Sequence, residues 1–167
     1  MDPYVSDVLV GIETRAWAED RARRTQEDSE EVDAVVEAEW AGVTMVDRFV
    51  AARGNHIEVT CIDGAILRGV CTEVGCDWLT IRGHAHDAVH VSQIARVVGA
   101  PFALHHDDVR RVTWTSFLRT LVGRWIRVQV PYGCAQGRLR SVARDHITFD
   151  DGSLIALQAM FIVRLPG

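Results

Sequence analysis

The chain contains one short pattern twice, first in residues 54–81 and again in residues 123–149. With one gap, the aligned identical pairs include Gly54 with Gly123, Ile57 with Ile126, Val59 with Val128, Gly64 with Gly133, Gly69 with Gly137, Val74 with Val142, Asp77 with Asp145 and Thr80 with Thr148. A self-match of this kind constrains the architecture more than local propensity does. It predicts that the 167 residues hold two copies of one small module.

Each copy has the pattern of a β-sheet. Apolar and polar residues alternate from His56 to Cys61, and Asp63-Gly64 is typical of a hairpin turn. Gly69 lies inside the next strand, where glycine permits a sharp bend. We therefore expect five short strands in each copy, bent at such glycines until the sheet closes into a small barrel that hides its edges.

Helices are expected before each copy. Residues 6–53 contain no proline, are rich in Ala, Glu and Arg, and place apolar residues three or four apart, Trp40 among them. This apolar stripe either packs on its own domain or associates with another helix. A second helix is expected to begin at Asp107 or Asp108 and to run to Leu121.

Charge and cysteine content limit the class of protein. Residues 1–50 carry 5 Arg and 13 Asp or Glu, a balance of −8, and residues 51–167 carry 13 Arg and 10 acids, a balance of +3. An acidic arm therefore precedes a mildly basic body. No Cys-x-x-Cys motif is present, and the alignment of Cys61 with Val130 and of Cys71 with Leu139 predicts buried thiols. Without a signal sequence or a long apolar run, a cytoplasmic location is expected.

These features resemble the Sm-like fold of Sm and Hfq proteins. The resemblance rests on Gly54, Ile57, Val59, Asp63, Gly64, Gly69, Val74, Gly75, Asp77 and Trp78 in the first copy, and on Gly123, Ile126, Val128, Gly133, Gly137, Val142 and Asp145 in the second. The whole chain is also similar to an uncharacterised actinobacterial group, some members of which are labelled Fis-type regulators. The resemblance implies an α+β protein in which an acidic N-terminal helical arm, residues 1–43, precedes two Sm-like small β-barrels, residues 44–100 and 101–167, joined through a helix.

Comparison with the same family predicts that the RNA-binding site of Sm proteins is absent from this chain. RNA-binding Sm proteins carry an Asn shortly after the Asp-aromatic turn, whereas Asp77 is followed here by Trp-Leu-Thr and Asp145 by His-Ile-Thr. The basic signature of the last hairpin is also missing from both copies. No residue of this chain is therefore assigned to an RNA-binding pocket.

Arginine-rich segments of the second copy leave a nucleic-acid function open. Arginine pairs with phosphate and aromatic side chains stack on bases. The candidate contacts are Arg124, Arg127, Arg138, Arg140 and Arg144. The competing interpretation is a solvated strand face that pairs with the acidic arm.

Catalysis and metal binding find less support in the sequence. No nucleophile has a recognisable partner base, and no constellation of Cys or carboxylate residues completes a metal site with His84 and His86, which are two residues apart. We therefore expect no enzyme activity, no cofactor and no metal. The predicted function is a cytoplasmic scaffold or adaptor that acts through protein–protein contacts and self-associates, with Trp40 and Trp78 as candidate partner contacts. Trp78 alternatively closes the end of its barrel. A nucleic-acid-associated protein is the alternative.

Overall fold

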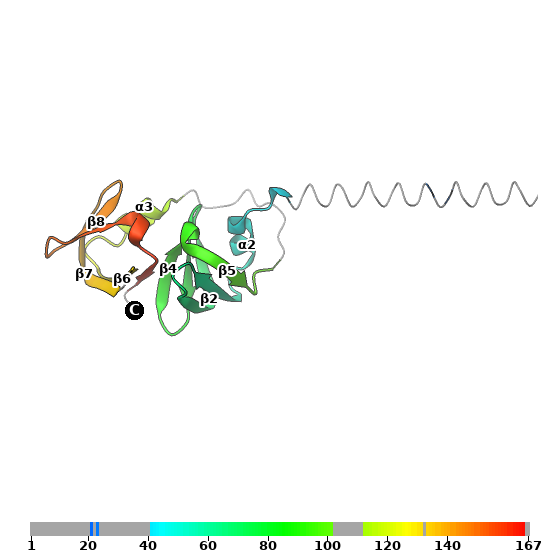
Figure 1. Ribbon diagram of the computed structural model, residues 1–167, viewed down its shortest axis with the longest axis horizontal. Helices are drawn as coiled ribbons and strands as arrows, with labels where there is room; N and C mark the ends of the chain where they lie inside the picture. The colour runs from blue at the N-terminus through cyan, green and yellow to red at the C-terminus, as the bar shows by residue number, and fades with distance from the viewer. Residues whose placement is uncertain (1–20, 22, 24–40, 102–111, 132, 166–167) are drawn as a thin grey trace, which may run out of the picture. The chain divides into compact units, whose positions relative to one another are not determined.

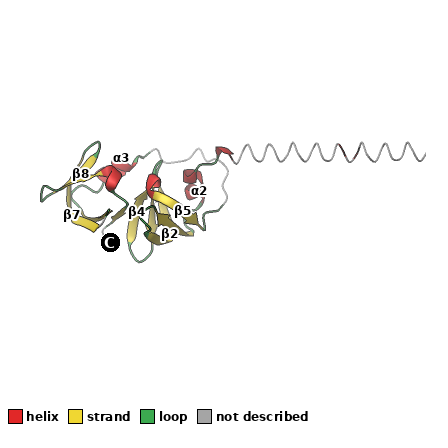
Figure 2. Cartoon of the chain, in the orientation of Figure 1, coloured by secondary structure: helices red, strands yellow, loops and turns green. Residues whose placement is uncertain are grey.

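The computed structural model describes residues 21, 23, 41–101, 112–131 and 133–165 (Figure 1). The described residues from Val43 onward belong to one compact unit, Val43–Gly167. Strands dominate this unit, and its helices are short (Figure 2).

The described residues of the unit form ten strands, two α-helices and two 3-10 helices. Helix α2 (Met45–Ala51) precedes β1 (His56–Cys61), β2 (Ile66–Val74), β3 (Trp78–Arg82), β4 (His86–His90), the 3-10 helix η1 (Val91–Gln93) and β5 (Ile94–Val98). Helix α3 (Trp114–Arg119) precedes β6 (Trp125–Val130), β7 (Gly133–Val142), β8 (His146–Phe149), β9 (Leu154–Ala156), the 3-10 helix η2 (Leu157–Ala159) and β10 (Ile162–Arg164). We call the elements from α2 to β5 the first half and those from α3 to β10 the second half.

The strands form one antiparallel sheet in the order β5-β1-β2-β3-β4-β10-β6-β7-β8-β9. Within each half the fifth strand lies beside the first, followed by the second, third and fourth. The register also recurs, because Ile57 lies opposite Gly69 and Ile126 lies opposite Gly137. These are positions that align in the duplicated sequence pattern.

The prediction of two separate Sm-like barrels joined through a helix is wrong. Strand β4 pairs with β10 along its edge, so that the two halves form one open sheet with β5 and β9 as its end strands. Helix α3 packs its buried Phe117 and Leu118 into the core of the second half. Two edges that would each remain unpaired in separate modules satisfy each other's backbone groups in this arrangement.

The core changes faces of the sheet where β4 meets β10. Successive side chains of a strand point to opposite faces. Accordingly Val89 and Ile162, which are paired, belong to the core of the first half, whereas their neighbours Ala88 and Val163, also paired, belong to the core of the second half. Each half therefore completes the hydrophobic core of the other.

The helix expected over residues 6–53 is interrupted at Val43 and Thr44, which lie between the helical residues 41–42 and helix α2. Arg21 and Arg23 are helical, most of that stretch lies outside the described residues, and α2 begins only at Met45. Thr44 is the N-cap, because its hydroxyl accepts from the Asp47 N–H while the Asp47 carboxylate accepts from the Thr44 N–H. The second expected helix begins at Trp114, capped by Thr113, and Asp107 and Asp108 lie outside the described residues.

Candidate functional site

Two strand edges of the sheet are candidates for contacts with other chains. Among the described residues, β5 pairs only with β1, and β9 pairs only with β8. Exposed apolar side chains lie on both strands, with Val98 43% and Leu154 65% exposed. An exposed edge with apolar side chains is a template for pairing with another strand.

The contact between β4 and β10 shows how edges of this type pair within the chain. Ile162 lies opposite Val89, Val163 opposite Ala88, and Arg164 opposite Asp87. Because the halves share one strand order, β9 occupies the place in the second half that β4 has in the first, and β5 likewise corresponds to β10. The outer edge of β9 is therefore equivalent to the edge that β4 presents to β10. The outer edge of β5 is likewise equivalent to the edge that β10 presents to β4.

The correspondence extends to single residues. Leu154 lies opposite Thr148 as Ala88 lies opposite Thr80, and Thr80 and Thr148 align in the repeat. Val97 lies opposite Val59 as Val163 lies opposite Val128, and Val59 and Val128 also align. The sequence alone did not identify these edge residues. The repeat alignment relates them to residues of β4 and β10, but only when the order of the strands is known.

An ion pair fixes the contact between β4 and β10. Nε of Arg164 donates to Oδ1 of Asp87 at 2.9 Å, and Nη2 donates to Oδ2 at 3.3 Å. The Asp87 side chain is 8% exposed and that of Arg164 is 49% exposed. Hydrogen bonding to this carboxylate raises the pKa of Arg164 above its ordinary value. The pair is bidentate, which adds geometric specificity to the register of the two strands.

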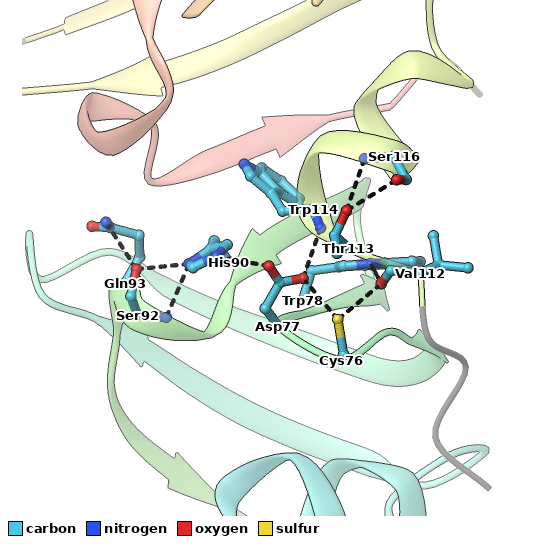
Figure 3. A network of polar contacts seen from close by, with 10 residues as sticks. All are labelled: Cys76, Asp77, Trp78, His90, Ser92, Gln93, Val112, Thr113, Trp114 and Ser116. Carbon is cyan, nitrogen blue, oxygen red and sulfur yellow. Dashed lines mark hydrogen bonds and ion pairs between the residues drawn. The ribbon is translucent and has the colours of Figure 1, made fainter. Parts of the chain in front are cut away.

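Trp78, a predicted partner contact, lies in the core of the second half and is 2% exposed. Its ring stacks on Phe117 with centroids 4.1 Å apart. Its Nε1–H donates to the Val112 carbonyl at 2.8 Å, as Figure 3 shows. These contacts anchor the start of α3 against β3 and leave the indole little surface for another chain. Trp40, the other predicted contact, lies outside the described residues.

Asp77 extends this network to the end of β4. Its Oδ1 accepts the backbone N–H of Trp114 at 2.7 Å, and its Oδ2 lies 3.4 Å from Nε2 of His90 (Figure 3). Nδ1 of His90 accepts the backbone N–H of Ser92 at 3.2 Å and lies 2.6 Å from the Ser92 hydroxyl oxygen. Asp, His and Ser thus stand in the order of a hydrolase triad, but here the histidine caps η1.

The five candidate arginines of the second half are all exposed; they are Arg124, Arg127, Arg138, Arg140 and Arg144. Arg138 lies opposite Trp125, which is 62% exposed, so both side chains lie on the outer face of β6 and β7. On the same face, Nε and Nη2 of Arg127 donate to Oε1 of Gln136 at 3.1 and 2.9 Å. The structure therefore brings two of the five candidate arginines, Arg127 and Arg138, to one exposed surface together with Trp125.

His84, in the turn between β3 and β4, and His86, the first residue of β4, differ in exposure. His84 is exposed, whereas Nε2 of His86 is buried and has no hydrogen-bond partner among the described residues. Burial, and then the nearby Arg82, lower the pKa of His86. In the described part of the chain, no group of three or more His, Cys, Asp or Glu residues is arranged to hold a metal ion. None of the described helices has the length and apolar character needed to cross a membrane.

No protein-family model matches this chain, and no curated protein matches it either. The resemblance to Sm-like proteins therefore stays a prediction from sequence motifs.

Proposed function

We propose that this chain is a non-catalytic scaffold that assembles with copies of itself by pairing β9 of one copy with β5 of the next. The supporting observation is the contact between β4 and β10, which joins edges of the same two types within one chain. Such an interface is heterologous, because different surfaces meet, and it generates closed rings or open filaments.

The pairing within the chain predicts the register between chains. Leu154 corresponds to Ala88 and Val97 to Val163, so Leu154 of one copy lies opposite Val97 of the next. The exposed Leu154 side chain then packs on the partly buried apolar surface around Val97 in the first half of the neighbour. Burial of one leucine contributes about 1.5–3 kcal/mol to association.

An assembly of several copies binds other proteins through several copies of the acidic segment. Each copy brings one acidic segment, residues 1–50 with a charge of −8, into the assembly. Several linked copies bind a basic or multivalent protein partner more tightly than one copy does, because later contacts form at a high effective concentration. This supports a scaffold or adaptor that works through protein–protein contacts.

Replacing Leu154 by arginine tests the edge directly. The substitution is expected to lower the association constant at least about tenfold, since the leucine contact is lost and a charge is placed on the edge strand. Sedimentation velocity over a range of concentrations measures the distribution of species. Ile62→Arg is the matched control, because Ile62 is also an exposed apolar residue and lies in the turn after β1. Unchanged assembly in the Leu154 variant, or equal loss in both variants, contradicts the proposal.

Disulfide trapping tests the register. In a Cys76→Ser, Cys134→Ser background, a Leu154→Cys chain mixed with a Val97→Cys chain is expected to form a mixed dimer under mild oxidation. The native Cys61 and Cys71 remain in place, because burial raises the pKa of each thiol to about 11 and makes it poorly reactive. Leu154→Cys mixed with Arg96→Cys is the control, since a one-residue shift points the two side chains to opposite faces. Equal trapping of both pairs contradicts the predicted register.

A nucleic-acid function is the second candidate, and the exposed Trp125 beside Arg138 favours it. Fluorescence anisotropy with labelled single-stranded RNA and DNA at low and moderate salt separates the two functions. The scaffold proposal predicts no tight binding. Tight, salt-sensitive binding that Arg138→Gln with Arg140→Gln abolishes, and that Arg53→Gln with Arg119→Gln leaves intact, establishes the second candidate instead.

A further inference from the structure

A cavity of about 650 Å³ lies beside β2, the turn between β3 and β4, and the ends of β4 and β10. This volume falls within the range of small-molecule sites, roughly 300–1,000 Å³. None of its lining residues belongs to the β5 or β9 edges, so a ligand there is independent of the proposed assembly.

Cationic and imidazole side chains dominate the polar lining of this cavity: His56, Arg68, Arg82, His84 and Arg164. The carboxylate in the lining, Asp87, is already paired with Arg164. Arg68 is paired with Glu58 at 2.6 Å, whereas Arg82 has no ion pair with any described residue. The cavity therefore carries an excess of positive charge, which favours an anionic ligand.

The wall of the cavity depends on two glycines. A Cβ at Gly69 would collide with the Arg82 carbonyl oxygen, and a Cβ at Gly83 would collide with the Arg68 carbonyl oxygen. The absence of side chains at both positions lets the backbone of β2 approach the turn after β3 closely. This approach places Arg68 and Arg82, each of which directly precedes one of the two glycines, on the same cavity.

The remaining lining is apolar. Ile66, Leu67 and Ile81 contribute to it, and Ile66 is exposed to solvent at the cavity. A ligand with an apolar body covers Ile66, while its anionic group reaches the arginines.

We propose that this cavity binds a small phosphorylated molecule whose phosphate is held by Arg82 and whose apolar body lies against Ile66. The planar guanidinium donates two parallel hydrogen bonds to phosphate oxygens, which a lysine cannot do. His84, exposed on the same turn, supplies a further donor.

Isothermal titration calorimetry of the full chain with phenyl phosphate tests the proposal. Phenyl phosphate is expected to bind, inorganic phosphate to bind more weakly, and phenol to give no signal. Arg82→Gln is expected to weaken phenyl phosphate binding about tenfold, by the loss of a charged hydrogen bond. Arg144→Gln is the matched control, because it removes an equally exposed arginine from outside the cavity. His84→Gln, at an exposed position of the turn, is a second variant that is also expected to weaken phenyl phosphate binding.

Hydrogen-exchange mass spectrometry locates the bound molecule. Protection is expected in residues 66–70 and 81–86. Any of three results overturns the proposal: no heat of binding with phenyl phosphate at millimolar concentration, equal affinity in the Arg82 and Arg144 variants, or protection confined to β6 and β7.

Discussion

Replacing Trp78 by alanine is expected to lower the free energy of unfolding by about 3–5 kcal/mol, the range for truncating a buried aromatic side chain. The indole is 2% exposed and stacks on Phe117, so its removal leaves a cavity between β3 and α3. Its hydrogen bond to the Val112 carbonyl is lost as well. Chemical denaturation followed by far-ultraviolet circular dichroism measures the change.

Two further tryptophan variants make this prediction specific. Trp78→Phe keeps most of the stacked surface, and Cys76 N–H still donates to the Val112 carbonyl, so a smaller loss of about 1–2 kcal/mol is expected. Trp125→Ala removes a tryptophan that is 62% exposed and is expected to change stability by about 0.5 kcal/mol or less. Similar losses for Trp78→Ala and Trp125→Ala would show that the Trp78 contacts do not stabilise the fold.

Replacing Arg164 by glutamine is expected to cost about 3 kcal/mol of stability. The substitution leaves the Asp87 carboxylate, 8% exposed, without the guanidinium that now neutralises it. The expected loss is at the lower end for a broken buried pair, because half of the Arg164 side chain is exposed and solvent screens the interaction. The same denaturation experiment measures it.

A double-mutant cycle separates the ion pair from general damage to β10. Asp87→Asn combined with Arg164→Gln removes both charges, so the double variant is expected to be more stable than the Arg164 single variant. Arg68→Gln is the control, since its ion pair with Glu58 is largely exposed and contributes about 0–1 kcal/mol. Additive losses in the cycle would show that Asp87 and Arg164 do not stabilise each other.

Local patterns in the sequence identified the strands, but not how their edges meet. The positions of Cys61 and Cys71 in the repeat predicted buried thiols, and both are buried. The pairing of β4 with β10 was missed, because it brings together residues such as Asp87 and Arg164 that are 77 positions apart in the sequence. Strand β10 has only three residues, which is too short for alternation to reveal its partner.

The candidate sites, too, were predictable only where they depend on local sequence patterns and not on contacts between distant segments. The exposure of the five arginines follows from their alternation with apolar residues or from their place in turns. The burial of Trp78 depends on Val112 and Phe117, which lie in a later segment, so the sequence left both of its roles open. The cavity at Arg82 depends on the close backbone approach at Gly69 and Gly83, and the repeat contained a signal only for the first of these glycines.

The exchange of side chains between the two cores links the folding of the halves. Trp78 and Ala88 come from the first half but complete the core of the second, and Ile162 comes from the second half but completes the core of the first. A fragment containing either half alone would leave apolar surface uncovered and a strand edge unsatisfied. Unfolding of one half thus removes contacts that stabilise the other, and thermal melting of the unit is expected to be a single cooperative event.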